Sequence, residues 1–444
     1  MEIDESIFKA YDIRGIVPKQ LNNELAERIG KAIVSFLGCK NVVVGQDMRE
    51  HSKELTESLI KGITFMGADV IYIGMCTTPM NYHANGMFGA DASVMVTASH
   101  NTSEWNGFKI CKKEAIPLSG ETGIQEIKEL AKNNKFPPAE EKGKVEVKEI
   151  IESYKDFIKE HYHNPENKKI KMVVDCANSM GLYELKSLEL PNIEIIPLFD
   201  ELDSSFPNHE ANPLKSETLK DLQEKVKEKG ADLGVAFDGD ADRCGFVDEK
   251  GNIIRSDFIT ALIAKDILLE KGSRKIFFDL RSSKVVKEVI EKKGGDALMC
   301  RVGHAFIKSQ MREEEAVFAG ELSGHFYFSE NFNTESSALA IVRIINIILK
   351  EKKQFSELVN ELKIYSQSGE INREVSNPDK VMKKVEERYR DGKTYHLDGV
   401  SVEYKDWWFN IRKSNTEPIL RINLEADSEE LMEEKIKEIL SMYE

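Results

Sequence analysis

One stretch of the chain decides the fold: Gly230-Ala231-Asp232-Leu233-Gly234-Val235-Ala236-Phe237-Asp238-Gly239-Asp240-Ala241-Asp242-Arg243. It indicates the end of a helix, a short buried strand and then a polar loop. Residues 89–101 and 315–325 show the same order of features. Each polar loop follows the carboxyl end of its strand, where open α/β sheets bind ligands. We therefore expect three related α/β domains, each of which contributes one loop to a common cleft.

The rest of the chain supports this α/β class. Short β-branched runs alternate with amphipathic Lys/Glu-rich segments, which predicts mixed, mostly parallel sheets covered by helices. Residues 133–144 resemble a linker, and Gly251-Asn252 forms a turn. Past Tyr365 a helical stretch precedes alternating strands, which predicts a smaller α+β domain. The expected domains are 1–144, 145–251, 252–365 and 366–444.

Composition limits the kind of partner. A chain of 444 residues with 41% hydrophobic and 31% charged residues is expected to fold into several domains. Its net charge of −15 argues against nucleic acid and anionic membranes, so a phosphorylated small molecule would be held by local cationic clusters. The six cysteines show no CxxC spacing, the N-terminus resembles no signal peptide, and residues 338–349 are too short to span a bilayer. We expect a cytoplasmic monomer or dimer.

The first polar loop contains a candidate nucleophile. Ser99 directly follows a buried strand, so its hydroxyl is held rigidly, and His100 and Asn101 place polar groups beside it. Lys109 lies close enough in sequence to place a cation beside a transferred phosphate. The alternative is an ordinary strand-end turn in which Ser and Asn satisfy backbone groups.

The second polar loop has the ligands of a divalent cation. Asp238, Asp240 and Asp242 alternate along an extended segment, so their carboxylates point to one side, and Arg243 adds a partner for an oxyanion. An EF-hand is disfavoured although Glu249 stands at its twelfth position, because Arg243 replaces the required glycine and the flanks are strands. A phosphatase of the haloacid dehalogenase type, with Asp238 or Asp240 as nucleophile, stays open.

The third and fourth polar loops suggest a sugar phosphate. Glu321, Ser323 and His325 combine a carboxylate, a hydroxyl and an imidazole, which suits vicinal sugar hydroxyls. Arg412 offers a fork for phosphate oxygens, completed by polar groups of the loop that follows. Those groups belong to Ser414, Asn415 and Thr416. A strand-end salt bridge of Arg412 is the alternative.

Together these loops resemble those of the α-D-phosphohexomutases, specifically the phosphomannomutase/phosphoglucomutase branch. The resemblance runs from Phe8-Lys9-Ala10-Tyr11-Asp12-Ile13-Arg14-Gly15 to residues 412–418, in the family's order. It implies that Ser99 carries a phosphoryl group, that the three aspartates bind Mg²⁺ with a phosphoserine oxygen, and that the third loop recognises sugar. It also implies that the fourth loop clamps the phosphate that is not transferred. Further implied active-site residues are Arg14, Lys109, Arg243, Arg281 and the Gly303-His304 pair.

The resemblance implies a mutase that interconverts hexose 1-phosphate and hexose 6-phosphate through a hexose 1,6-bisphosphate, which also serves as activator. Three candidates for the general base stay open: His100, Lys109 and His304. A phosphoglucosamine mutase shares the mechanism, but would more usually carry Gln where Leu322 stands and Gly where Asn415 stands. A phosphatase and a non-catalytic sugar-phosphate sensor also stay open.

Overall fold

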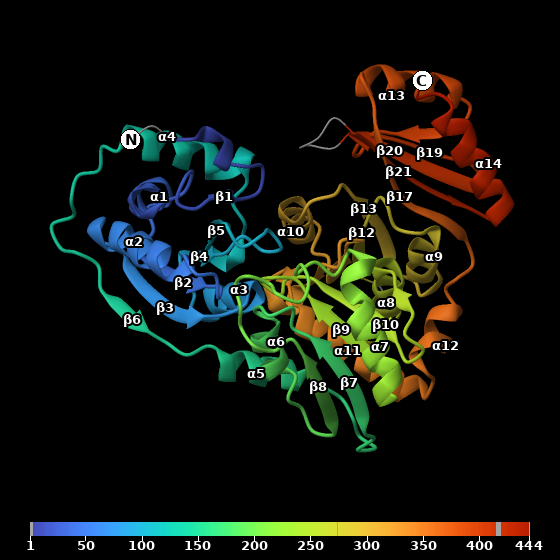
Figure 1. Cartoon of the computed structure of the whole chain (residues 1–444), viewed down its shortest axis with the longest axis horizontal. Coiled ribbons are helices and arrows are strands. Elements are labelled where there is room, and N and C mark those ends of the chain that lie inside the picture. Colours follow the sequence, from blue (N-terminus) through green and yellow to red (C-terminus); the bar gives the residue numbers. More distant parts are fainter. Residues whose placement is uncertain (1–2, 273, 414–418, 444) are drawn as a thin grey trace.

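The computed structural model describes residues 3–272, 274–413 and 419–443. The chain forms three α/β domains and a smaller fourth domain at one end of the molecule (Figure 1). All six cysteines are buried and unpaired. No helix in the described ranges is long and apolar enough to cross a membrane.

The first domain has a six-stranded sheet with the order β1-β5-β4-β2-β3-β6. Its strands are β1 (Ile13–Ile16), β2 (Asn41–Gln46), β3 (Asp69–Met75), β4 (Ala92–Val96), β5 (Trp105–Lys112) and β6 (Val145–Val147). Its helices are α1 (Asn23–Leu37), α2 (Ser52–Phe65), α3 (Thr78–Met87) and α4 (Gln125–Asn133). Local signals set the helix ends: the Asn22 side chain caps α1 at its start, and Gly38 ends it in the left-handed region at φ 61°.

The second and third domains each have a five-stranded sheet. The second contains α5 (Ile151–Glu160), β7 (Ile170–Asp175), α6 (Gly181–Ser187), β8 (Ile193–Leu198), α7 (Lys220–Lys229), β9 (Leu233–Phe237), β10 (Cys244–Asp248) and β11 (Ile253–Ile254). The third contains α8 (Ser256–Lys271), β12 (Lys275–Asp279), α9 (Lys284–Lys292), β13 (Asp296–Cys300), α10 (His304–Glu313), β14 (Phe318–Gly320), β15 (Phe326–Phe328), β16 (Thr334–Glu335), α11 (Ser337–Glu351) and α12 (Phe355–Asn360).

The three α/β domains share one topology, as the sequence predicts. In each, a central strand has parallel neighbours, and a third parallel strand turns back through a hairpin into an antiparallel strand. The hairpins are β4–β5, β9–β10 and β14–β15. The sheets are therefore mixed, and the expected polar loops are the three hairpin connections.

Strand β6 extends the first sheet beyond the expected boundary at residue 144. It pairs in parallel with the edge strand β3, with Val70 opposite Val145. Its three residues are exposed, so main-chain hydrogen bonds and not core packing place it there. The first sheet thus ends after residue 147.

The fourth domain has a sheet of the order β17-β21-β20-β19-β18, antiparallel throughout. It comprises β17 (Ser366–Glu374), α13 (Pro378–Arg388), β18 (Lys393–Tyr395), β19 (Val400–Glu403), β20 (Trp407–Lys413), β21 (Ile419–Ala426) and α14 (Glu429–Leu440). The predicted α+β character is confirmed.

The cores follow the strand alternation. On β2, Val43 points into a large core that continues through the second and third domains, whereas Val42 and Val44 point into a core of the first domain alone. The fourth domain packs a separate core around Phe409 and Ile422. Apolar packing therefore joins the first three domains and leaves the fourth on its own.

Candidate active site

The three hairpin loops meet at one place. The main-chain N–H of Thr78 in the first domain donates to the Asp240 carbonyl in the second at 3.0 Å. The N–H of Cys244 donates to the Gly324 carbonyl in the third domain at 3.1 Å. A Cβ atom on Gly239 would lie 2.2 Å from the Ser99 carbonyl oxygen, so only glycine permits this close approach. The expected convergence of the loops is present.

Ser99 is held at the centre of this meeting point. Its hydroxyl donates to Asp238 Oδ2 at 2.8 Å and lies 3.1 Å from His100 Nδ1. Its backbone is in the left-handed region at φ 51°, and its N–H donates to the Thr97 hydroxyl at 2.9 Å. The residue is 1% exposed. A buried, oriented hydroxyl beside a carboxylate and an imidazole suits a group that gives and takes a phosphoryl group.

The three aspartates converge as the sequence predicts. Asp238, Asp240 and Asp242 are buried, and each offers a carboxylate oxygen within 4.8 Å of the others. Lys109 Nζ donates to Asp240 Oδ2 at 2.6 Å and to Asp242 Oδ2 at 2.5 Å. Burial raises the pKa of Asp238, and repulsion from the other two carboxylates adds to the rise. The three aspartates therefore form a buried group with an excess of negative charge. They lie between two strands, β9 and β10, and not between two helices, so the loop is not an EF-hand.

This donor set fits a hard divalent cation. Asp240 Oδ1 is buried without a hydrogen-bond partner among the residues that the structure describes, and Asp242 Oδ1 lies 3.4 Å from Nε2 of His325. Buried carboxylate oxygens without a donor are costly unless a cation satisfies them. Thr78 Oγ1 donates to Asp240 Oδ2 at 2.6 Å and fixes the orientation of that carboxylate. Oxygen ligands alone, without sulfur or imidazole, are those that Mg²⁺ prefers.

Two arginines add positive charge around Ser99. Arg14 donates to Asp12 Oδ2 at 2.7 Å, to Asn101 Oδ1 at 2.7 Å and to the Ala98 carbonyl at 3.1 Å. Arg243 Nε lies 3.8 Å from Asp238 Oδ2. Arg243, then burial and Arg14, hold the pKa of His100 well below its usual range, so its imidazole is neutral at pH 7.

The third loop forms a hydrogen-bonded cluster around Glu321. This carboxylate accepts from the Gly303 N–H at 2.9 Å, the Tyr327 hydroxyl at 2.8 Å and the Ser323 hydroxyl at 3.1 Å. His325 Nδ1 lies 3.0 Å from Glu321 Oε2. Burial opposes protonation of His325, but Asp242 and Glu321 outweigh it and raise its pKa to about 9. The predicted sugar-binding groups are therefore preoriented.

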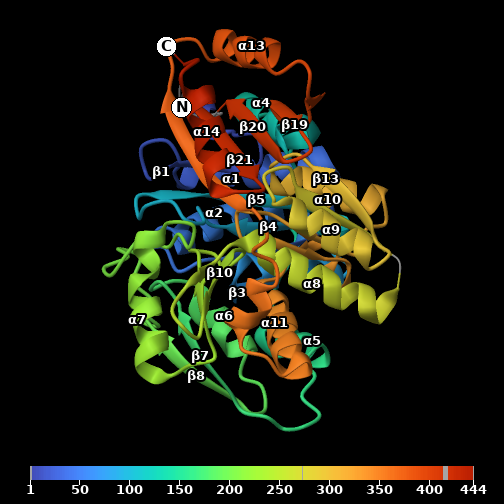
Figure 2. The same ribbon diagram turned by 90° about the vertical axis from the view of Figure 1, so that its right-hand side faces the viewer.

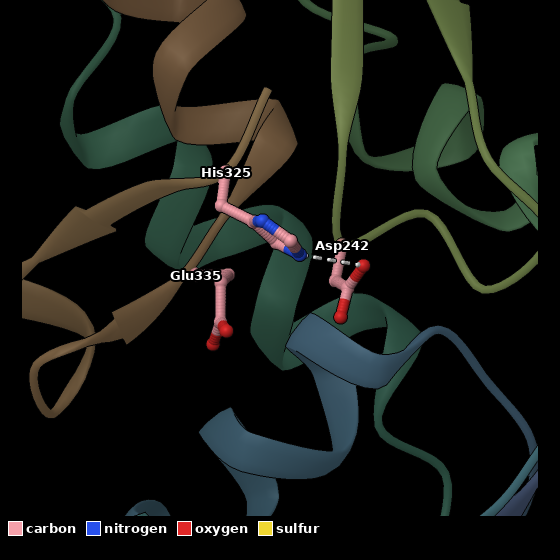
Figure 3. Close-up of side chains that lie close together, drawn as sticks. All are labelled: Asp242, His325 and Glu335. Atoms are coloured by element: carbon pink, nitrogen blue, oxygen red, sulfur yellow. Dashed lines mark ion pairs between the residues drawn. The ribbon is translucent and has the colours of Figure 1, made fainter. Parts of the chain in front are cut away.

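The structure adds two residues, Lys308 and Glu335, that the sequence does not indicate. Figure 3 shows His325 pointing toward Asp242, with Nε2 3.4 Å from Asp242 Oδ1, and Glu335 beside them. Glu335 forms a fully buried ion pair with Lys308 at 2.9 Å. His304 Nδ1 lies 3.6 Å from Glu335 Oε1, and burial and Lys308 hold the pKa of His304 well below its usual range. Nothing in the local sequence around Lys308 or Glu335 signals this pairing.

The fourth loop is described only in part. Ser414, Asn415 and Thr416 lie outside the described residues. Arg412 is buried and donates to Glu370 Oε2 at 2.7 Å, while Arg421 Nη1 lies 3.4 Å from Glu370 Oε1. Arg281 of the third domain is held by Asp279 and reaches within 3.8 Å of Glu370. Arg412 thus makes a salt bridge with Glu370 at the end of its strand. Arg281 and Arg421 lie beside the same glutamate, and such a cluster of arginines suits a phosphate.

Family models of four consecutive domains match the chain. Domain I of phosphoglucomutase/phosphomannomutase matches residues 5–138, and domain II matches residues 152–251. Domain III matches residues 255–365, and the C-terminal domain matches residues 370–441. The matches cover nearly the whole chain, in the order that the fold shows.

Full-length relatives agree. A phosphomannomutase of Methanocaldococcus jannaschii is 44% identical, over 99% of this chain and 98% of that protein. A phosphomannomutase of Escherichia coli is 36% identical, over 98% of each. A crystal structure of a phosphoglucomutase/phosphomannomutase family protein from Burkholderia thailandensis matches with a TM-score of 0.91 at 30% identity, over 99% of this chain and 97% of that one. On its domains, its loops and these relatives, the chain belongs to the phosphoglucomutase/phosphomannomutase family.

Proposed function

We propose that this chain is a phosphohexomutase that interconverts the 1-phosphate and 6-phosphate of mannose, glucose or both. The observation that carries the proposal is the Ser99 hydroxyl, buried 2.8 Å from Asp238 where three domains meet. Phosphorylated Ser99 donates its phosphoryl group to the free sugar hydroxyl and gives a hexose 1,6-bisphosphate. The P–O bond to Ser99 breaks, the bond to the sugar oxygen forms, and the hydroxyl proton passes to a base. The departing Ser99 oxygen takes up a proton. After the bisphosphate has turned over, its other P–O bond to the sugar breaks, the new bond to the Ser99 oxygen forms, and the Ser99 hydroxyl proton replaces the phosphoryl group on the sugar oxygen by way of the base.

The pKa directions narrow the choice of base. Burial opposes the charge on Lys109, but Asp240 and Asp242 outweigh it and raise the pKa of its ammonium, so it stays protonated. His100 and His304 are neutral at pH 7, because their pKa values lie well below the usual range. A neutral imidazole accepts a proton and an ammonium does not, which leaves His100 and His304 as the candidates for the general base.

Asp238, Asp240 and Asp242, with a phosphoserine oxygen, would hold Mg²⁺. Bound there, Mg²⁺ supplies positive charge that stabilises the moving phosphoryl group. Lys109 and Arg243 add charge from the protein itself. Glu321, Ser323 and His325 would bind the sugar hydroxyls in either orientation, and Arg412 with Ser414, Asn415 and Thr416 would hold the phosphate that is not transferred.

Coupled assays test the proposal. Mannose 1-phosphate, glucose 1-phosphate and glucosamine 1-phosphate are supplied side by side with a hexose 1,6-bisphosphate as activator. We expect turnover of mannose 1-phosphate, because the full-length relatives compared are phosphomannomutases, and of glucose 1-phosphate, because the matching family models include phosphoglucomutases. Preference for glucosamine 1-phosphate would favour the phosphoglucosamine mutase alternative, and release of free phosphate without isomerisation would favour a phosphatase.

Replacement of Ser99 gives the strongest single test. Ser99→Ala should abolish isomerisation, because no neighbouring group replaces the phosphate carrier. Intact-mass and peptide measurements on the unsubstituted protein should find an acid-stable phosphate on Ser99. An acid-labile phosphate on Asp238 or Asp240, or substantial mutase activity of Ser99→Ala, would contradict the mechanism.

A further inference from the structure

Arg49 lies directly behind the Ser99 loop, between β2 and α2. The residue is 3% exposed. Its Nη2 donates to the carbonyls of Ser99 at 2.8 Å and Asn101 at 2.6 Å. Its Nη1 donates to the carbonyls of Thr102 at 2.7 Å and Trp105 at 3.1 Å. One guanidinium therefore fixes the main chain of a single loop at four points.

The chemistry of this contact requires arginine. A guanidinium carries five N–H donors in a rigid plane, and the fifth, on Nε, donates to Asp47 Oδ2 at 3.2 Å. Every donor is thus used. A lysine ammonium has three donors around a point and cannot match carbonyls spread along a loop. The ring of Phe206 in the second domain packs against one face of the guanidinium, with its centroid 5.4 Å from Arg49 Cζ.

Asp47 is fixed in its turn. Its carboxylate accepts from the Ser52 hydroxyl at 2.5 Å and from the Arg49 N–H at 3.0 Å. The Asn106 side chain, at the start of β5, donates to the Ser52 hydroxyl at 2.9 Å. The support for the Ser99 loop thus rests on the ends of β2, α2 and β5, which are regular elements and not loops.

The strained backbone of Ser99 explains what this support achieves. A non-glycine residue in a sparsely populated backbone region costs on the order of 1 kcal/mol or more, and persists when its surroundings hold it there. Ser99 adopts φ 51°, and the carbonyl of the same residue is bonded to Arg49. Loss of the bond from Arg49 to that carbonyl would remove one of the contacts that hold the Ser99 backbone in this region.

We propose that Arg49 is a positioning residue for phosphoryl transfer: it holds the Ser99 loop in the strained conformation that aims the hydroxyl at the aspartate cluster, without touching the substrate. This inference rests on the proposed function, since it assumes that Ser99 carries the phosphoryl group. It goes beyond that function because it makes the rate of phosphoryl transfer depend on Arg49, a residue that does not touch the reacting groups.

Arg49→Ala and Arg49→Lys test the inference. A reacting atom displaced by about 1 Å costs roughly a hundredfold in rate, so we expect kcat to fall by about that factor in both variants. KM for the sugar phosphate should stay within about twofold, because the groups expected to bind sugar and distal phosphate lie in other domains. Transfer of phosphate from added hexose 1,6-bisphosphate to Ser99, followed by intact mass, should slow to the same extent.

Chemical rescue separates positioning from general damage to the fold. Guanidinium or methylguanidinium ion at millimolar concentration should restore part of the lost kcat of Arg49→Ala and none in Arg49→Lys, whose side chain fills the space. The matched control is Arg28→Ala, since Arg28 pairs with Glu24 along α1, and its kinetics should be unchanged.

Unchanged kcat in Arg49→Lys would overturn the inference, and so would a raised KM with unaltered kcat, or a loss of kcat that guanidinium does not relieve in a folded Arg49→Ala. If Arg49→Ala does not fold, the kcat and KM of Arg49→Lys decide the question. Absence of mutase activity in the unsubstituted protein would contradict the proposed function instead.

Discussion

The first three domains and the fourth domain place their functional residues in opposite ways. The first three share a core that runs from Val43 to Leu362, and their loops are bonded to one another across domain boundaries. The fourth lies at one end of the molecule in both views (Figures 1 and 2) and packs its own core. Its contacts with the third domain include the Lys284 N–H to Glu425 at 2.9 Å and Arg281 to Glu370 at 3.8 Å.

The difference follows from what each part does in the proposed reaction. Phosphoryl transfer needs reacting groups fixed to a fraction of an ångström, which a shared core and buried bonds provide. Capture and reversal of a bisphosphate need a part that can open and close, which a domain with a core of its own allows. Variants in the two parts should therefore fail in different ways.

The largest effect is expected at the aspartate cluster. Asp240→Asn removes one buried charge while keeping the shape, and loss of one electrostatic stabiliser costs about a hundredfold or more in kcat. KM should change little, and added chelator should inhibit the unsubstituted protein. Asp221→Asn, on the exposed face of α7, is the control. Full activity of Asp240→Asn, or insensitivity to chelator, would remove the metal from the mechanism.

A smaller effect is expected at Glu184, where the first three domains join. This buried carboxylate accepts from Thr77 Oγ1 at 2.9 Å, Tyr154 OH at 3.0 Å and the Ala338 N–H at 3.0 Å. Burial raises its pKa from 4.5 to about 7. The folded state thus keeps its proton to higher pH than the unfolded state, so the stabilisation is present below about pH 4.5 and is lost as pH rises through about 7.

Glu184→Gln removes this titration. Between pH 5 and 8 the free energy of unfolding of the first three domains should fall on the order of 2 kcal/mol further in the unsubstituted protein than in the variant. Far-ultraviolet circular dichroism follows mainly the three larger domains. With Trp105 of β5 replaced by Phe in both proteins, fluorescence of Trp407 and Trp408 follows the fourth domain. An equal pH dependence in both proteins, or one confined to the fluorescence signal, would show that Glu184 does not stabilise the joined core.

The smallest effect is expected at Arg412. Its replacement should make the bisphosphate intermediate dissociate from the enzyme more often, and should not slow the chemical step. A charge-assisted hydrogen bond contributes roughly 1.5 kcal/mol or more, so Arg412→Ala should release the bisphosphate about tenfold more often. Ser99 is then left unphosphorylated, and the activator concentration for half-maximal activity should rise by a similar factor. Arg388→Ala, which breaks a surface pair with Glu438 in the same domain, is the control. An unchanged activator requirement would make the Arg412–Glu370 pair purely structural.

The sequence predicts best what local patterns encode. Ser99, Asp238 and Glu321 follow apolar strands directly, so their position at strand ends can be derived from a few neighbouring residues. Arg49, Lys308 and Glu370 cannot be found this way, because each acts on a partner that the fold brings close from a distant part of the chain. Strand β6 escapes sequence reasoning for a related reason: Val145-Glu146-Val147 alternates apolar and polar residues, but three exposed residues are too short a run to predict a strand, and only pairing with β3 defines it.

The distribution of the cores has a consequence for how the chain is made. Domains fold during synthesis largely in order from the N-terminus. The core of the first domain uses residues between Ile7 and Ala131, and so closes early on the ribosome. The core that joins the first three domains needs Leu362 and stays open until about four-fifths of the chain has emerged. The three aspartates thus emerge well before Leu362, but the core that fixes their domain against that of Ser99 is complete only when the third domain is in place.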